Sequence, residues 1–192
     1  MENKNSAFKE FISPILVLVV ICFVTTFLLA FVYGITAPII AENTAKAASE
    51  ARMQLLPAAD NFSDSGADLV VYEDGKVYAV DCFTADNGEG MVVTVKSNSY
   101  GGMLTAMVGI DKDGAVTGVQ ITEHADTPGV GTKAHAAEHL KQYVGHTELA
   151  SDNVKAHADD IVEVTGASVS SGAVHKAVYC ALEQYKAMGG VK

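Results

Sequence analysis

The stretch Thr165-Gly166-Ala167-Ser168-Val169-Ser170-Ser171-Gly172-Ala173-Val174 lies near the C-terminus and places small and hydroxyl residues directly before an apolar pattern. Val174, Val178 and Leu182 recur at helical spacing, so the stretch is expected to open the last helix. A helix start has unpaired backbone N–H groups and a partial positive charge, which would suit a phosphate. Ser, Thr and Gly are also ordinary N-cap residues, and local chemistry alone favours that second interpretation.

The chain has 192 residues and a formal net charge of −10. This length suits one membrane anchor followed by one domain of about 150 residues. The negative charge leaves nothing to neutralise the phosphates of a nucleic acid, so nucleic acid is not expected as a partner. Cys82 and Cys180 are far apart in the sequence, and whether they pair stays open. A CxxC spacing is missing from the sequence, so an iron–sulfur or zinc-thiolate centre is not expected.

An apolar segment close to the N-terminus predicts a transmembrane helix. The residues from Phe11 to Ala41 carry no charge, and the densest part, Ile15 to Val32, spans 18 residues. As a helix this part measures ~27 Å, about the thickness of the bilayer core. Pro38 predicts a break beyond it. A cleaved signal peptide is the competing interpretation, but it would have a shorter apolar core and an A-x-A-like cleavage site.

The distribution of positive charge predicts the orientation of this anchor. Lys4 and Lys9 precede the apolar segment, whereas Lys46 and Arg52 follow it. The slight bias favours a cytoplasmic N-terminus and a domain outside the cytoplasm, in a single-pass protein of the cell membrane. The expected division of the chain is a tail and anchor in 1–41, a helical stalk and linker in 42–60, and a domain in 61–192.

Short apolar runs separated by turn residues predict an antiparallel meander of about five strands. The runs are 69–72, 76–80, 91–95, 105–110 and 116–121. Glu73-Asp74-Gly75 and Asp111-Lys112-Asp113-Gly114 are turn signals, and 60–66 is expected to be a loop. The second turn has a faint likeness to a calcium loop but lacks the later acidic ligands, so the turn is favoured. Together with the helices, this pattern predicts an α+β fold with helices flanking an antiparallel sheet.

The segment after the meander combines a tight loop with a histidine pair. Asp126-Thr127-Pro128-Gly129-Val130-Gly131 predicts a turn that a ligand could approach closely. Lys133 to Val144 is expected to form a solvated helix, in which His135, Glu138 and His139 match an inverted zinc-protease spacing. A third ligand is not evident, so no metal site is expected. Residues 159–164 are expected to be strand-like. The remaining histidines are expected at the surface: His124, His146, His157 and His175.

Taken together, these motifs resemble the FMN-binding domain family. They occur in the family's order: Tyr100-Gly101-Gly102, the turn at Asp113-Gly114, the loop 126–131 and the motif 165–171. With one N-terminal anchor and this length, the chain is similar to the G subunits of the Rnf ion-translocating electron transport complexes. The C subunits of the sodium-pumping NADH:quinone reductases are the nearest alternative.

The resemblance implies that FMN is joined through its phosphate to the hydroxyl of Ser168, where the family usually has threonine. Val162 stands where the family tends to have aspartate, and Asp126 and Val130 replace its usual glutamate and leucine. A separate flavin transferase would attach the cofactor from FAD, since no nucleophile-activating base lies near Ser168 in the sequence. The phosphate end would be lined by Thr165, Gly166, Ala167, Ser170 and Ser171, and the ring end by Thr127, Pro128 and Gly129.

The resemblance therefore implies an electron-carrying flavoprotein subunit that works beside other membrane subunits. The whole complex would couple electron transfer between ferredoxin and NAD to sodium or proton movement, and this chain alone would not pump. No catalytic residue is expected in the chain, which is not predicted to be a stand-alone enzyme. Two other classes stay open, namely a cofactor-free membrane-anchored binding module and a metallohydrolase that would rest only on His135, Glu138 and His139.

Overall fold

The computed structural model describes residues 12–72, 75–157 and 160–191. The chain divides into two compact units, Met1–Ala48 and Ser49–Lys192. The first contains most of the long helix α2, and the second contains the sheet and the remaining helices. Some positions used in the sequence predictions lie outside the described residues: Lys4, Lys9, Glu73, Asp74 and Asp159.

Helix α2 spans Ser13–Leu55 and is the described helix that is long and apolar enough to cross a membrane. The predicted break at Pro38 is wrong, because the helix continues through this residue to Leu55. A proline removes one backbone hydrogen bond, and the strong helix formers that follow from Glu42 continue the helix. In the apolar part, the hydroxyls of Thr25 and Thr26 donate to backbone carbonyls one turn earlier. These hydroxyls are therefore satisfied without water.

Six strands form one antiparallel sheet in the order β1-β3-β4-β5-β6, and β2 also pairs with β3. The predicted meander is confirmed. The predicted loop 60–66 is wrong in its middle, because the residues of β1 pair with the end of β3, where Phe62 lies opposite Ala85. The strands are β1 Phe62–Asp64, β2 Val71–Tyr72, β3 Val77–Ala85, β4 Gly90–Ser99, β5 Gly102–Asp111 and β6 Val116–Glu123.

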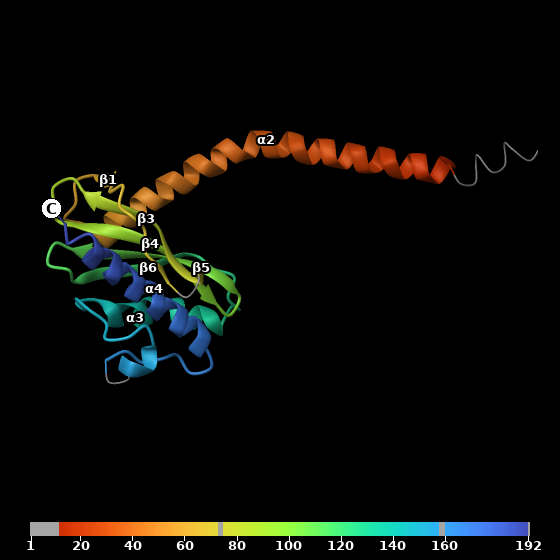
Figure 1. Ribbon diagram of the computed structural model, residues 1–192. Coiled ribbons are helices and arrows are strands. Elements are labelled where there is room, and N and C mark those ends of the chain that lie inside the picture. The colour runs from red at the N-terminus through yellow and green to blue at the C-terminus, as the bar shows by residue number, and fades with distance from the viewer. Residues whose placement is uncertain (1–11, 73–74, 158–159, 192) are drawn as a thin grey trace, which may run out of the picture. The chain divides into compact units, whose positions relative to one another are not determined.

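Helix α4, Ser168–Ala187, packs its apolar face on this sheet (Figure 1). The predicted helical spacing is confirmed, because Val174, Val178 and Leu182 are buried in the main hydrophobic core. Gln184 is buried on the same helix, where its amide bonds to Val70 N–H and Asp68 C=O. The core thus fixes both the position and the rotation of α4 against the sheet.

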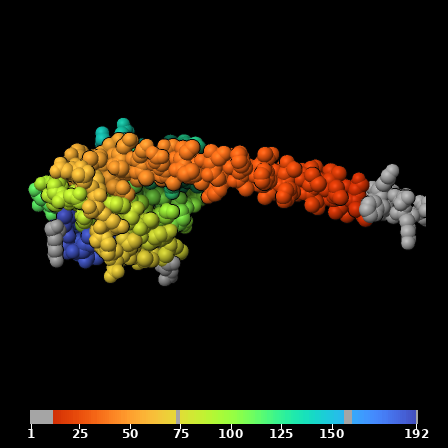
Figure 2. All heavy atoms as spheres, turned by 90° about the horizontal axis from the view of Figure 1, so that it is seen from above, coloured from red at the N-terminus to blue at the C-terminus, as the bar shows by residue number. Residues whose placement is uncertain are grey.

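The last turns of α2 belong to the second unit and pack against the sheet (Figure 2). Leu55 is buried over Gly109, where an added Cβ would lie 2.9 Å from the Leu55 carbonyl oxygen. The Thr117 hydroxyl donates to the same carbonyl, and the Arg52 guanidinium lies 3.6 Å above the centre of the Phe83 ring. A hydrogen bond, a cation–π contact and close backbone packing therefore hold this helix end.

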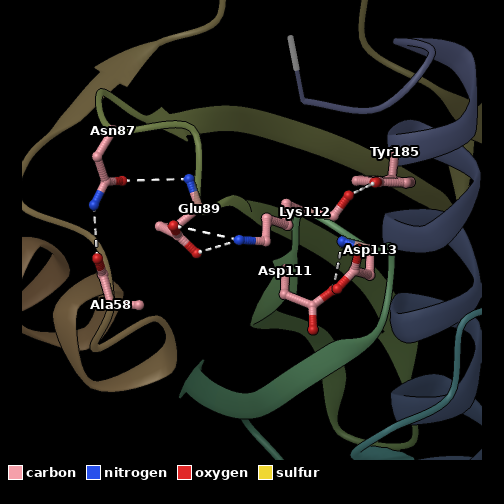
Figure 3. A network of polar contacts seen from close by, with 7 residues as sticks. All are labelled: Ala58, Asn87, Glu89, Asp111, Lys112, Asp113 and Tyr185. Carbon is pink, nitrogen blue, oxygen red and sulfur yellow. Dashed lines mark hydrogen bonds and ion pairs between the residues drawn. The ribbon is translucent and has the colours of Figure 1, made fainter.

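A polar network ties together the turns at one end of the sheet (Figure 3). Lys112 lies 3.2 Å from Glu89, and the Tyr185 hydroxyl donates to the Lys112 carbonyl at 2.7 Å. The Asp111 carboxylate accepts the N–H groups of Asp113 and Ala115 at 2.9 and 2.8 Å. That carboxylate organises a backbone turn, so the turn interpretation of this motif is confirmed.

The segment 131–143 differs from the sequence prediction. Three short helices, η3 Gly131–His135, α3 Ala137–Leu140 and η4 Lys141–Tyr143, replace the single helix expected there. Ala136 has an extended conformation that interrupts the helical path. The predicted solvated character is also wrong, because His139, Leu140 and Tyr143 are buried. Leu140 and Tyr143 pack into the main hydrophobic core, so tertiary contacts override the local helical preference of the segment.

Two further sequence predictions fail near α4. The strand-like segment 159–164 is not a strand where it is described, because Val162 N–H donates to the Gln142 side chain and Val164 N–H to the Ser171 hydroxyl. His175 is buried inside the domain, which contradicts its expected place at the surface. The short helix η5, Val154–His157, precedes this segment, and the side chain of His157 lies outside the described part. Cys82 and Cys180 are both buried and free.

Candidate functional site

A cavity of about 550 Å³ lies beside the first turn of α4. Its volume falls within the range of roughly 300–1,000 Å³ that is common for cofactor pockets. Three separate segments build it: the turn between β4 and β5, the loop before η3, and the start of α4. The lining residues are Tyr100, Thr127, Val130, Gly131, Gly166, Ala167, Ser168, Val169 and Ser170.

The start of α4 presents backbone N–H groups at this cavity. Ala167 is the N-cap residue, and no side chain in the described part caps the helix there. The expectation that the hydroxyl cluster acts as an N-cap is therefore wrong, because the cap position has no hydroxyl. The N–H groups of Ser168, Val169 and Ser170 have no acceptor within an α-helix, which leaves them available to an anion.

The hydroxyl residues of this motif differ sharply in exposure. Ser168 is exposed at the cavity, whereas Ser170 and Ser171 are buried. Ser171 accepts the Val164 N–H at 3.1 Å and does not line the cavity. A second cavity of about 410 Å³ adjoins the same helix start and is lined by Thr165, Gly166 and Ser168 among others. Ser168 therefore contributes to both cavities and is the accessible serine of the cluster.

The loop before η3 forms the opposite side of the cavity. The Thr127 carbonyl accepts the N–H groups of Val130 and Gly131 at 3.2 and 3.0 Å, which closes a tight turn. Gly129 has a φ of 76°, a left-handed conformation that favours glycine. Thr127 lines the cavity, whereas Pro128 and Gly129 are exposed and are not among its lining residues. Of the residues expected at the ring end, only Thr127 therefore reaches the cavity.

Asp126 is the charged group that connects the cavity walls, and it is not among the site residues that the sequence predicts. Its side chain is buried and accepts hydrogen bonds from the Ser99 hydroxyl at 2.6 Å and the Gly101 N–H at 2.8 Å. Burial alone would raise the pKa of Asp126, but these bonds, one from Ser170 and the nearby His135 together hold this pKa below its ordinary value. Asp126 is therefore a carboxylate at neutral pH.

His135 lies behind Asp126, with Nε2 3.0 Å from Asp126 Oδ2. Its ring also lies against the exposed ring of His124 in a tilted arrangement, with 4.6 Å between the ring centroids. His139 points elsewhere: its ring is buried against Tyr143, and its Nδ1 lies 2.9 Å from Gln142 Nε2. In the described residues, no group of three or more His, Cys, Asp or Glu side chains is arranged to hold a metal ion.

Burial of these two histidines predicts acid sensitivity of the domain. Burial lowers the pKa of both His135 and His139. The nearby His124 lowers the pKa of His135 further, whereas Asp126 opposes that shift. His135 in turn lowers the pKa of His139. As the pH falls below about 6.5, the unfolded chain takes up protons that the folded domain resists. The stabilising contribution is complete above that pH and is lost as the pH falls towards the lowered values.

We therefore expect the melting temperature of the domain to fall by several degrees between pH values of about 7.5 and 5.5. Thermal melts over this range provide the measurement. The double variant His135→Gln/His139→Gln should show a clearly smaller fall. An equal fall in the double variant and the native chain would contradict this assignment.

Comparisons with known proteins agree with this arrangement. Residues 99–183 match the FMN-binding domain family, and residues 16–55 match the RnfG N-terminal region. The first match contains both the Tyr100 turn and the whole 165–171 motif. The second contains the apolar part of α2.

Two named protein subunits and one protein of known crystal structure are similar to this chain. The G subunit of the proton-translocating ferredoxin:NAD(+) oxidoreductase complex of Clostridium ljungdahlii is 30% identical over 91% of this chain and 91% of its own length. The G subunit of an ion-translocating oxidoreductase complex of Methanosarcina acetivorans is 30% identical over 95% of this chain and 98% of its own length. The crystal structure of Shewanella oneidensis NqrC has a TM-score of 0.45 at 20% identity, covering 69% of this chain and 70% of that one.

Both matched relatives extend over nearly the whole chain, from the apolar helix to α4. The chain therefore belongs to the RnfG family, the G subunits of the ion-translocating (Rnf) oxidoreductase complexes, and it carries that family's FMN-binding domain.

Proposed function

We propose that this chain is a membrane-anchored flavoprotein subunit that carries electrons in an ion-translocating ferredoxin:NAD oxidoreductase complex, with FMN bound covalently through Ser168. The observation that carries the proposal is the cavity at the start of α4, where Ser168 is exposed. The cavity lies within the FMN-binding domain, and the match to RnfG relatives covers nearly the whole chain.

The chemistry of the cavity lining fits FMN. At one side, the N–H groups and partial positive charge of the α4 N-terminus suit a phosphate group. At the other, Tyr100, Val130 and Val169 offer apolar and aromatic surface for a flat ring. Gly166 has a φ of 81°, and nothing lies within 4 Å of where its Cβ would be, so the backbone is open to close approach. FMN supplies the redox chemistry, since flavins accept two electrons and release them singly.

Ser168 would form the tether as a phosphoester. Its Oγ would bond to the FMN phosphorus, its hydroxyl proton would be lost, and AMP would leave from the FAD donor. In the described part of the chain, no side chain is hydrogen-bonded to this hydroxyl, so nothing there acts as an activating base. An external flavin transferase is therefore part of the proposal, and the chain does not flavinylate itself.

The partners of the chain follow from its family. The relatives are named as subunits of complexes, so other membrane subunits are its partners. The flavin pocket would face one of their redox centres. The cytoplasmic N-terminus and the extracytoplasmic position of the domain complete the proposal, since a tether prevents loss of FMN where no flavin pool exists.

The proposed function is tested in membranes that contain the assembled complex. Reduced ferredoxin should bleach the flavin absorbance of this chain and reduce NAD, and both signals should vanish when the chain carries Ser168→Ala. Co-purification of the other subunits with the variant provides the control for assembly. Unchanged NAD reduction in assembled Ser168→Ala complexes would refute electron transfer through this cofactor.

Orientation is tested by cysteine labelling in intact cells. Asp60→Cys places a thiol at an exposed position of the domain, whereas native Cys82 and Cys180 are buried and native Cys22 lies within the apolar segment of α2. A membrane-impermeant maleimide should label the Asp60→Cys chain in intact cells, and should label Asn5→Cys only after the cells are broken. The reverse pattern would place the domain in the cytoplasm.

A further inference from the structure

Asp126 contacts each of the three segments that build the cavity. The Ser99 hydroxyl and Gly101 N–H, on either side of Tyr100, donate to Oδ2 and Oδ1 respectively. The Ser170 hydroxyl, in the first turn of α4, borders Gly131 together with the same carboxylate and helps to lower the pKa of Asp126. Gly131 fits between these groups, since an added Cβ would lie 2.8 Å from the Asp126 Cβ and 2.9 Å from the Ser170 Oγ.

We propose that Asp126 is the positioning residue of the flavin pocket: its buried carboxylate joins the Tyr100 turn, the loop 127–131 and the α4 start, and so holds Ser168 in register with the pocket. This inference rests on the proposed function for its flavin, but the joining of the three segments does not. Asp126 itself is not among the residues that line the cavity. It acts through Tyr100, Gly131 and Ser170, which do line it.

A carboxylate suits this position because the Ser99 hydroxyl, the Gly101 N–H and the Ser170 hydroxyl are all donors, and His135 Nε2 also lies 3.0 Å from Oδ2. An ionised Asp accepts at both oxygens and donates at neither, so Ser99, Gly101 and Ser170 can all bond to it. An asparagine of the same size would turn an amide N–H₂ towards at least one of these donors. One buried polar group would then lose its hydrogen-bond partner. This loss weakens the contact between the three segments without creating a cavity.

A matched control exists at the other end of the same strands. The Asp111 carboxylate accepts two backbone N–H groups. Asp111 is paired with Gly90 at one end of β4 and β5, whereas Asp126 lies at the other end, where Ser99 is paired with Gly102. Asp111→Asn therefore makes the same exchange of carboxylate for amide away from the flavin pocket, and the amide oxygen can keep both N–H bonds because both reach Oδ1. Comparing the two variants separates a local effect on the pocket from a general loss of stability.

The first experiment follows hydrogen exchange in the flavin-free full-length protein. In Asp126→Asn, peptides covering 97–103, 125–132 and 164–172 should exchange together, roughly tenfold faster than in the native chain. Peptides from the central parts of β4 and β5 should keep their rates. In Asp111→Asn, the three pocket segments should keep their native rates, and any acceleration should be confined to the turn 111–115. Exchange rates in Asp126→Asn that equal those of the native chain at all three pocket segments would overturn the proposal. Uniform acceleration of the whole domain would overturn it as well.

The second experiment uses the protein co-expressed with a flavin transferase. Asp126→Asn should reduce the flavinylated fraction severalfold and alter the visible circular dichroism of the flavin that remains, because the ring loses its fixed surroundings. Asp126→Glu should restore part of both signals, and Asp111→Asn should match the native chain. Should Asp126→Asn fold poorly, Ser99→Ala removes one donor and is the milder variant for both measurements.

The outcomes separate the two claims. A native chain without flavin would count against the proposed function, while the exchange measurement would still decide the role of Asp126. Native flavinylation and an unchanged flavin spectrum in Asp126→Asn would overturn the positioning role and leave the proposed function standing.

Discussion

Replacing Ser168 by alanine is expected to abolish covalent flavin while leaving the domain folded. The substitution removes the one exposed serine hydroxyl of the motif at the α4 start, and Ser170 and Ser171 are buried. Alanine is a good helix former, and the Ser168 side chain makes no hydrogen bond in the described part of the chain, so the melting temperature should change by no more than about 2 °C. Intact-mass measurement after co-expression with a flavin transferase should give the bare polypeptide.

Two further variants control for this result. Ser168→Thr keeps a hydroxyl at the same atom position, so it should keep the flavin mass and in-gel flavin fluorescence. Val71→Ala changes an exposed residue of β2 that does not line the cavity, and it should remain flavinylated. A flavin-sized mass on Ser168→Ala would sink the assignment of the acceptor.

Replacing Gly101 by alanine is expected to be the most damaging single change to the pocket. An added Cβ would collide with the Ala125 carbonyl and lie 2.7 Å from the Asp126 backbone nitrogen. Both are backbone atoms, which cannot move aside as a flexible side chain can. We expect a loss of about 3 kcal/mol, hence a melting temperature lower by roughly 10 °C, together with loss of flavin attachment.

Gly172→Ala is the matched control for that change. Gly172 lies inside α4, and nothing stands within 4 Å of where its Cβ would be. Alanine in a helix interior is better than glycine by roughly 0.5–1 kcal/mol, so the melting temperature should rise by about 2 °C. Thermal melts of both variants provide the measurement, and a Gly101→Ala protein as stable as the native chain would contradict the close packing of the Tyr100 turn.

Much of the fold could be predicted because its signals are local. The apolar segment from Ile15 to Val32 and the short apolar runs of the meander each carry their own pattern, and the structure confirms the elements they predict. The spacing of Val174, Val178 and Leu182 likewise identified the buried face of α4. Each of these patterns is the spacing of apolar residues along a single helix or strand, and this spacing can be observed directly in the sequence.

The failed predictions concern residues whose environment is set by distant parts of the chain. The segment 131–143 has helical composition, but it is broken at Ala136, and its buried side chains pack into the core. His175 has no local sequence signal for burial, yet it is buried in the domain. Its Nε2 lies 3.0 Å from the carbonyl oxygen of Ser151, which belongs to a distant loop. Strand β1 is only three residues long and is defined by its pairing with β3. These contacts join residues that are far apart in the sequence, so the spacing of apolar residues within a short segment does not predict them.

The candidate site was half visible in the sequence. The motif 165–171 and the loop 126–131 stood out by their composition, and the structure brings Thr127 and Ser168 to one cavity. The role of Asp126 was not visible, because its partners Ser99 and Gly101 come from a turn that is distant in sequence. An acidic residue directly before a Thr-Pro-Gly turn is the sequence signal that could have identified it.

Peptide mapping of the native protein tests the central claim most directly. Trypsin should release a peptide spanning residues 156–176, which contains four hydroxyl candidates, Thr165, Ser168, Ser170 and Ser171. After co-expression with a flavin transferase, this peptide should carry the mass of FMN less one water, and fragmentation should locate it on Ser168. A bare peptide under the same conditions, or a flavin located on any other residue, would contradict the account.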